Sequence, residues 1–470
     1  MLKNRFFNLP YFRRILVLLF FLIFLLFFLQ YFGLPYFTSI TEILLILKIE
    51  FILLFSIILI ISSKISGYLS VFSMFLFCSF LFNYGRIFLD FFTDFNINEG
   101  DLFSNITISD KTILELLYLI IFYLLAATLA FLIFYKKKNV VLKQNYFFVK
   151  TGKRIILTLA IPLVILTILQ LKFILQVGYL AIFTGEAADF KYNSLINLVT
   201  RIVYFGYLIF LAGIPNKKDF IRISYLFLGI SLIIALKGQR GAFMLLLVYI
   251  IWYYHNIYDV RFNLKKAFKI TIFVLIISQI VLALRTADTH DELSVVNIPY
   301  EFLRLNGISI LIPAYLIEFK SSFVNDGVPY LFTPIYDYFY RIFVDSQIFY
   351  EGRTYDLITT SNYLSNQLIY FINRPAYYAG MGTGSSYLAE FYDFGGLFFG
   401  SFCFFILVSL IMKWEYLLFS NRTILFLSFI VVSKFIYMPR DSFFKIVNDI
   451  LSLLVIFIVF TYLKKLKFKL

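Results

Sequence analysis

The sequence predicts an all-helical, polytopic integral membrane protein with about twelve transmembrane helices, and three observations support this fold class. Hydrophobic residues make up 61% of the chain and charged residues only 15%, whereas soluble domains have roughly 45–50% and about 25%. The mean hydropathy is +0.88, so the chain carries more apolar surface than a soluble core can bury. Its apolar runs are continuous for about 20 residues, as over 15–32, which suits membrane helices and not the alternating strands of a membrane barrel.

The expected helices form two groups along the chain. Nine come before one long polar stretch and three come after it, near 15–34, 42–62, 67–90, 112–135, 154–176, 196–214, 222–237, 241–256, 267–285, 389–412, 420–438 and 443–463. The stretch between the ninth and tenth helices covers 286–388 and is far longer than a helix connection needs. We therefore expect a single transmembrane domain over 1–470, with one large loop over 286–388.

Basic residues orient these helices in the membrane. Lys and Arg gather in the N-terminal tail, in 136–154, in 217–222, in 261–269 and at the C-terminus. With twelve spans, all of these segments fall on one side, and loops rich in Lys and Arg face the cytoplasm. We therefore expect both termini in the cytoplasm and the loop over 286–388 on the opposite, outer side. The same basic segments are expected to attract anionic membrane lipids.

The large loop is also rich in aromatic residues, and two interpretations of these rings stay open. Tyr and Phe cluster over 330–350. Aromatic rings stack on sugar faces, but they also concentrate on amphipathic helices at the membrane–water interface. The segment 309–317 is a further candidate for an interfacial or re-entrant piece.

Cysteine and histidine are too rare to suggest a metal centre. The chain has two cysteines, Cys78 and Cys403, both in apolar runs, and two histidines, His255 and His290. These four residues provide neither a disulfide framework nor a typical set of zinc ligands. We expect no metal ion, no cofactor and no nucleic-acid partner.

Nine basic residues lie at the expected outer ends of spans, against the inside-positive rule: Arg86, Lys172, Arg201, Lys237, Arg240, Arg285, Lys434, Arg440 and Lys445. Three of the arginines stand out. Arg240 occupies a glycine-flanked turn, Arg285 ends the ninth span, and Arg440 follows Pro439 between the last two spans. A charge near the hydrocarbon needs compensation, and guanidinium groups bind phosphate oxygens in a bidentate manner. These three arginines are therefore candidate ligands of a lipid diphosphate. The alternative for each is snorkelling to headgroups or a local ion pair.

Three short motifs resemble those of the Wzy-type O-antigen (oligosaccharide repeat-unit) polymerases. They are Leu236-Lys-Gly-Gln-Arg-Gly-Ala242, Gly380-Met-Gly-Thr-Gly-Ser-Ser-Tyr-Leu-Ala-Glu-Phe-Tyr-Asp-Phe-Gly-Gly396 and Pro439-Arg-Asp-Ser442. The resemblance also extends to the architecture of almost the whole chain, with its many spans and one large loop late in the sequence.

The resemblance implies a GT-C-like membrane glycosyltransferase in the bacterial inner membrane, active at the periplasmic face. It further implies undecaprenyl-diphosphate-linked repeat units as donor and acceptor, and a Wzz-type chain-length regulator as partner. By resemblance, Arg240 and Arg440 match arginines that face the diphosphate, and Glu390 matches an acidic motif position. Arg353 and Arg374 of the loop are weaker matches.

The implied reaction needs a base for the acceptor hydroxyl, and two residues are candidates. Glu390 begins the tenth span, and His290 follows Arg285 at the start of the loop. Carboxylate and imidazole groups both act as general bases. Their alternatives are charge complementation at a helix N-terminus for Glu390 and a plain surface position for His290. Asp441 is expected to orient Arg440. A single displacement would invert the anomeric centre.

Two other functions remain open at this point. An O-antigen ligase would share most of these features. A lipid-linked oligosaccharide flippase or other transporter would instead be expected to have short loops and internal repeats.

Overall fold

A computed structural model describes residues 10–33, 39–97, 106–136, 142–177, 190–235, 240–258, 260, 298–324, 327–345, 353–380, 382–418 and 420–467 of the chain. These residues form helices and contain no strand, as the composition predicts. The chain divides into two compact units. The first comprises residues 1–138, 299–416 and 434–445, and the second comprises 139–298, 417–433 and 446–470.

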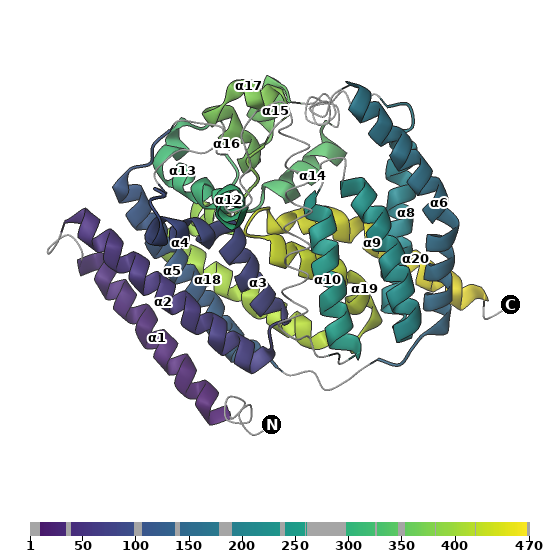
Figure 1. Ribbon diagram of the computed structural model, residues 1–470, viewed down its shortest axis with the longest axis horizontal. Helices are drawn as coiled ribbons and strands as arrows, with labels where there is room; N and C mark the ends of the chain where they lie inside the picture. Colours follow the sequence, from purple (N-terminus) through teal and green to yellow (C-terminus); the bar gives the residue numbers. More distant parts are fainter. Residues whose placement is uncertain are drawn as a thin grey trace. The chain divides into compact units, whose positions relative to one another are not determined.

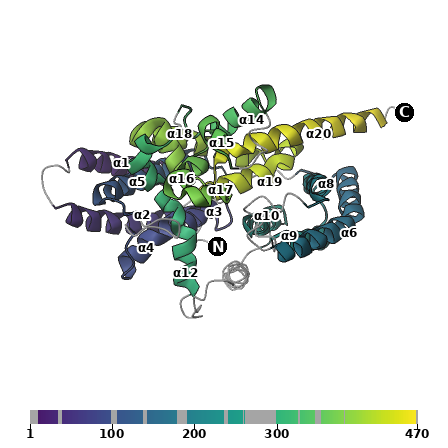
Figure 2. The same ribbon diagram turned by 90° about the horizontal axis from the view of Figure 1, so that it is seen from above.

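The first unit is organised around α5 (Asp110–Phe134), the most thoroughly buried of its long helices (Figures 1 and 2). In its most apolar stretch of 18 residues, 89% of the residues are buried, whereas the corresponding share for α1 (Pro10–Gly33) is 17%. Figure 2 shows α5 between α1 and α2 (Ile40–Ser66). The residues of α5 itself are apolar and buried on nearly all sides of the helix, which is typical of a central helix.

The third apolar segment of this unit combines three helical pieces. They are α3 (Val71–Ser79), the π-helical turn η4 (Phe80–Tyr84) and α4 (Gly85–Phe92). A π-turn inserts extra backbone into a helix and often occurs at a functional position. An ion pair of 2.5 Å between Lys48 and Asp90 ties α2 to α4.

The polar stretch between the two groups of spans forms short helices in the first unit. They are α12 (Ile298–Asn306), η7 (Gly307–Ile310), α13 (Leu311–Phe319), η8 (Lys320–Ser322), α14 (Thr333–Phe343), α15 (Tyr355–Thr360), α16 (Leu364–Ile372) and α17 (Arg374–Tyr378). The long helix α18 (Tyr387–Leu417) follows and is kinked at Gly396, whose φ is +62°. The short η10 (Phe443–Lys445) also belongs to this unit.

The second unit contains the remaining long helices. They are α6 (Tyr146–Val177), α8 (Asn193–Ala212), α9 (Lys217–Ala235), α10 (Arg240–Tyr258), most of α19 (Arg422–Tyr437), and α20 (Ile446–Lys467). α6 and α8 pack along their length (Figure 1). Gly152 and Gly206 lie at this contact, where a Cβ on Gly152 would come within 2.5 Å of the Gly206 carbonyl oxygen. Small residues of this kind let membrane helices approach closely.

Eight helices among the described residues are long and apolar enough to cross a membrane. They are Tyr11–Gly33, Ile40–Ser66, Val71–Phe92, Asp110–Phe134, Tyr146–Ile174, Asn193–Ala212, Pro299–Ser322 and Tyr387–Leu417. Seven coincide with expected spans, but Pro299–Ser322 lies inside the expected loop over 286–388. The expected spans at 222–237, 241–256, 420–438 and 443–463 are helical as α9, α10, α19 and α20, outside that group of eight. The span at 267–285 lies outside the described residues, so the count of twelve stays a prediction.

Candidate functional site

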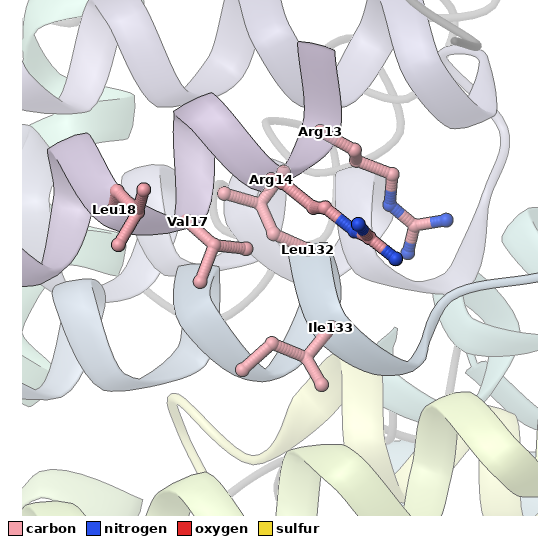
Figure 3. A pocket seen from close by; sticks show the side chains of 6 residues that line it. All are labelled: Arg13, Arg14, Val17, Leu18, Leu132 and Ile133. Carbon is pink, nitrogen blue, oxygen red and sulfur yellow. The ribbon is translucent and has the colours of Figure 1, made fainter. Parts of the chain in front are cut away.

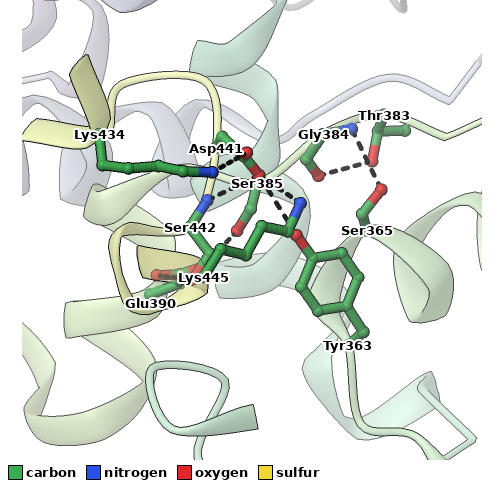
Figure 4. A network of polar contacts seen from close by, with 10 residues as sticks. All are labelled: Tyr363, Ser365, Thr383, Gly384, Ser385, Glu390, Lys434, Asp441, Ser442 and Lys445. Atoms are coloured by element: carbon green, nitrogen blue, oxygen red, sulfur yellow. Dashed lines mark hydrogen bonds and ion pairs between the residues drawn. The ribbon is translucent and has the colours of Figure 1, made fainter. Parts of the chain in front are cut away.

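Two of the sequence motifs meet in the first unit, although about forty residues separate them in the chain. The backbone N–H of Ser385 donates to the carbonyl oxygen of Arg440 (3.3 Å), and that of Tyr387 donates to the carbonyl of Met438 (3.1 Å). The segment before α18 therefore runs beside the segment that precedes η10. These bonds bring the polar side chains of both segments into one cluster (Figure 4).

Gly384 makes this close approach possible. Its φ is +84°, and an added Cβ would lie 2.9 Å from the carbonyl oxygen of Arg440. A side chain at this position would be strained by its backbone conformation and would also press on the partner segment. The backbone N–H of Gly384 donates to the hydroxyl of Ser365 (3.2 Å), which fixes the turn against α16. The close approach of the two segments therefore explains why a glycine occupies position 384 of the motif.

Glu390 lies at the centre of the junction between the two segments. Its side chain is 1% exposed. The hydroxyl of Ser385 donates to Oε1 (2.6 Å) and the hydroxyl of Ser442 donates to Oε2 (3.1 Å). The carboxylate therefore links one motif to the other through two hydroxyl groups. A buried carboxylate needs such donors to offset its desolvation.

Asp441 contacts two lysines and a tyrosine hydroxyl in the same cluster. Its carboxylate pairs with Lys445 (2.5 Å) and, more distantly, with Lys434 (3.9 Å). The hydroxyl of Tyr363 donates to Oδ1 at 3.2 Å, and the ammonium of Lys445 lies 4.5 Å from the centre of that ring. We expected Asp441 to orient Arg440, but its carboxylate instead holds Lys445 and Tyr363.

The phenol of Tyr363 lies among charged groups from several elements. Burial raises its pKa well above the usual value, and the carboxylates of Asp441, Glu390 and Asp337 act in the same direction. The phenol therefore stays protonated and serves as a donor. In the loop, Arg353 donates to the amide oxygen of Asn366 (2.5 Å). Burial lowers the pKa of this guanidinium.

The guanidinium of Arg440 reaches the last residue of α12, Asn306. This guanidinium donates to the carbonyl oxygen of Asn306 (3.3 Å) and lies 5.6 Å from the centre of the Phe82 ring. Arg86, which is 2% exposed, donates to the carbonyl of Arg304 (2.8 Å). Two arginines from distant parts of the sequence therefore reach the same short stretch of backbone beside η4.

The predicted site residues have different outcomes. Glu390 lies in the polar cluster of the first unit, and Arg440 joins that cluster through its backbone carbonyl while its guanidinium bonds to Asn306. Arg240 is the first residue of α10 in the second unit, and its side chain lies outside what the structure describes. Arg285 and His290 also lie outside the described residues. Their meeting with Arg440 at one diphosphate site therefore stays a prediction.

Sequence reasoning did not assign roles to several members of the cluster. Lys434 and Lys445 stood out only as cations at outer helix ends, and Tyr363 and Asp337 were not singled out for the site. The spacing of Asp441 and Lys445, four residues apart, is a signal for an ion pair on a helical turn. The contact with Tyr363 has no such local signal, because 78 residues separate it from Asp441.

A cavity of about 540 Å³ lies in another part of the first unit (Figure 3). It is lined by Arg13, Arg14, Val17, Leu18, Leu132 and Ile133. Tyr392, two residues after Glu390, contacts Glu115 near the start of α5, whereas Leu132 is near the end of α5. The helical rise separates these positions by about 25 Å, so the cavity does not belong to the polar cluster. Within the described ranges, no three His, Cys, Asp or Glu side chains are grouped to hold a metal ion.

Comparison with known proteins identifies one family. The family model for O-antigen polysaccharide polymerase Wzy matches residues 15–469, nearly the whole chain. No curated protein and no solved structure matches the chain.

Proposed function

The chain belongs to the O-antigen polysaccharide polymerase Wzy family, and from this premise we propose that it transfers a growing glycan between undecaprenyl-diphosphate carriers. Family membership and the eight apolar helices make it a membrane O-antigen polymerase. The proposal adds the identity of the lipid carrier and places the reaction at the periplasmic face of the inner membrane. The observation that carries it is the cluster that joins Glu390 to the cation-bearing segment Arg440–Lys445.

The reaction that we propose is a single displacement at the anomeric carbon of the donor. A hydroxyl at the non-reducing end of the acceptor repeat unit forms the new C–O bond. The bond from that carbon to the diphosphate breaks, and its electron pair leaves with undecaprenyl diphosphate. The hydroxyl proton passes to a base. Such a displacement inverts the anomeric centre.

The departing diphosphate needs positive groups fixed in place before the reaction. In our proposal Arg440 supplies one, because its guanidinium is partly exposed and makes a single described hydrogen bond at 3.3 Å, to Asn306. Lys445 supplies a second charge and is held by Asp441. Arg240 and Arg285 remain proposed as further ligands of the diphosphate. Because these groups neutralise the leaving group, the proposed mechanism does not require a metal ion.

The base is proposed to be Glu390, with His290 as the other candidate. The carboxyl group of Glu390 lies next to the segment that carries the cations, and its longer hydrogen bond, 3.1 Å from the hydroxyl of Ser442, is the one that an acceptor hydroxyl would replace. We also propose a Wzz-type chain-length regulator as a partner of the polymerase.

The test is the loss of long glycan chains when the cation is removed. Arg440→Ala is expected to lower elongation by about 100-fold or more, the usual effect of removing one group that stabilises a transition-state charge. Arg440→Lys should restore part of it. Surface glycans from cells that carry each variant are separated by gel electrophoresis, with immunoblots to establish equal amounts in the membrane.

Lys111→Ala provides the control, because Lys111 is an exposed cation at the start of α5. It should leave the ladder of long chains unchanged. A normal ladder from Arg440→Ala would overturn the role of Arg440. Normal ladders in a strain that lacks the whole gene would overturn the polymerase proposal itself.

A further inference from the structure

The helix α14 carries a row of exposed aromatic rings. Tyr336 is 40% exposed, Phe339 47% and Phe343 76%, and Phe332, just before the helix, is 36% exposed. At 3.6 residues per turn these four positions fall on one side of the helix. The rings of Phe339 and Phe343 stack with their centres 6.1 Å apart. We call Phe332, Tyr336, Phe339 and Phe343 the aromatic stripe.

The other side of α14 is attached to the protein. Thr333 and Pro334 are buried. The hydroxyl of Thr333 donates to the carbonyl of Asn362 (3.1 Å), and the carboxylate of Asp337 accepts from the hydroxyl of Ser361 (2.6 Å). The helix also packs on η10. These contacts fix which side of α14 faces outward, so the exposure of the stripe does not come from a loosely attached helix.

The stripe continues into the exposed face of α18. The ring of Phe332 contacts that of Phe394 (5.1 Å between centres), Phe394 contacts Phe399 (5.7 Å), and Phe399 contacts Phe402 (6.4 Å). Along α18, Phe399, Phe402, Ile406 and Leu410 are 43–56% exposed. They recur every three or four residues on one side of a helix that is long and apolar enough to span a membrane. In a membrane protein such a face is covered by lipid.

We propose that the aromatic stripe of α14 lies in the lipid bilayer at its interface with water, as a continuation of the lipid-facing side of α18. The partner is thus the membrane surface, in which α14 lies with Phe339 and Phe343 among the upper parts of the acyl chains. Rings of this type favour that zone because they are apolar bodies at the edge of the hydrocarbon. The proposal does not depend on the polymerase reaction.

Continuity with α18 favours lipid over the other possible occupants. A glycan-binding face would combine rings with polar side chains that accept and donate hydrogen bonds. The exposed residues Ile342 and Val344 beside the stripe are apolar (54% and 67% exposed), and the exposed Arg341 falls on the side of the helix opposite the stripe. A second copy of the chain would have to compete with lipid for a surface that runs directly into a membrane span. Lipid can cover the aromatic stripe of α14 and the exposed face of α18 together.

The test uses the full-length chain in liposomes, with single cysteines that carry an environment-sensitive nitrobenzoxadiazole fluorophore. Cys78 and Cys403 are first replaced by Ala. Reporters are placed at Phe339 and Phe343 in the stripe, at Phe402 as a lipid-facing reference on α18, and at Tyr355 and Tyr378 as controls. The two controls are 55% and 50% exposed aromatic residues in α15 and α17 of the same unit. Quenching is measured with nitroxide-labelled phospholipid from the membrane and with iodide from water.

Reporters at Phe339 and Phe343 are expected to be quenched by the lipid nitroxide at least about twofold more than the controls, and to resist iodide. Equal lipid quenching at the stripe and at the controls, or full access to iodide, overturns the proposal. So does shielding from iodide that appears only when glycan is added.

A second measurement covers the case in which the cysteine variants do not fold. The photoreactive residue p-benzoylphenylalanine keeps an aromatic ring at Phe339, with the same residue at Tyr355 as control. Crosslinks from Phe339 to phospholipid support the proposal, and crosslinks to a second copy of the chain contradict it.

Discussion

At the scale of single residues, Glu390 connects two motifs through hydroxyl groups, and a Gln in its place would keep the shape of the side chain but could not act as a base. In Glu390→Gln the amide can accept from one serine hydroxyl and donate to the other, so we expect the variant to reach the membrane in normal amounts. If Glu390 is the base, elongation should fall by roughly 10²–10⁴-fold. The ladder of surface glycans and an in vitro assay with purified lipid-linked repeats measure this loss.

Glu115→Gln is the matched control, because Glu115 also accepts a hydrogen bond from a hydroxyl, that of Tyr392 (2.5 Å), outside the cluster. It should keep long chains. If Glu390→Gln retains full elongation, Glu390 only positions Ser385 and Ser442, and His290 remains as the candidate base.

The burial of the Asp337 carboxyl leads us to expect that the stability of the protein depends on pH. Burial raises the pKa of its carboxyl from 3.8 to about 6, against the opposing effect of Ser361 and Arg341. The folded state therefore holds this proton more tightly than the unfolded state. The resulting stabilisation is complete below about pH 4 and is lost as the pH rises through about 6.

Asp337→Asn removes this effect, since an amide does not titrate in this range. The variant should unfold at nearly the same temperature as the wild type at pH 4 and at a higher temperature at pH 8. The gain in free energy of unfolding is at most on the order of 3 kcal/mol. Thermal unfolding in detergent across this range measures the difference, and a pH-independent difference between the two proteins would contradict the explanation.

The sequence motifs predicted Glu390 and Arg440 as site residues, but they did not predict Tyr363 or Asp337. Glu390 and Arg440 each belong to a short sequence motif, and the structure places both in the first unit. The phenol of Tyr363 and the carboxylate of Asp337 join them only through the tertiary fold. No local spacing reports such contacts, because the contacting residues are dozens of positions apart. For Arg240, Arg285 and His290 the predicted roles stay predictions.

At the scale of helices, the contact between α6 and α8 depends on glycine. A Cβ on Gly152 would lie 2.5 Å from the Gly206 carbonyl oxygen and 2.6 Å from the Phe210 nitrogen. Gly152→Ala must therefore push the two helices apart, which we expect to lower the free energy of unfolding by about 1–3 kcal/mol. The midpoint of thermal unfolding in detergent should fall accordingly.

Gly229→Ala in α9 is the control within the same unit, because a Cβ there meets no atom within 4 Å. This change should be neutral or slightly stabilising, since Ala favours helix by about 1 kcal/mol over Gly. Similar losses of stability in both variants would show that the close approach of α6 and α8 is not the cause.

Hydropathy predicted most helices because it reports the apolar stretches directly, but it did not report where helices end. The helix α6 begins at Tyr146 rather than near 154, since Lys150, Lys153 and Arg154 interrupt the apolar run within its first three turns. The ion pair of Lys153 with Asp219 (2.7 Å) stabilises this polar end. The apolar helix Pro299–Ser322 was assigned to the loop because Glu301 and Arg304 interrupt the apolar run. These two side chains pair with each other at 2.8 Å.

At the scale of the whole molecule, the side of the membrane on which each segment lies can be tested directly. If 286–388 is one outer loop, cysteines introduced at Ser294 and at Asp345 should both react with an impermeant maleimide in intact spheroplasts. If instead Pro299–Ser322 crosses the bilayer, only one of the two will react before permeabilisation. A cysteine at Lys143, between α5 and α6 in an expected cytoplasmic segment, serves as the inner reference.

Overall composition and basic loops predicted a multi-pass membrane protein, and the family match agrees with the resemblance seen in the motifs. The GT-C-like fold, the single outer loop and the positions of the termini stay predictions, because charge and hydropathy report which segments enter a bilayer and not how those segments pack together.

The backbone pairing of Ser385 with Arg440 has a consequence for how the polymerase is made. Residues 417–433, which lie between the two paired segments, belong to the other unit, so the chain leaves the first unit and returns to complete it. During translation, Glu390 is therefore synthesised and inserted well before Ser442, Asp441 and Lys445 leave the ribosome. Nascent chains that stop short of residue 440 should hold an acid without its serine and lysine neighbours, and should be targets for membrane quality-control proteases instead of partly active enzymes.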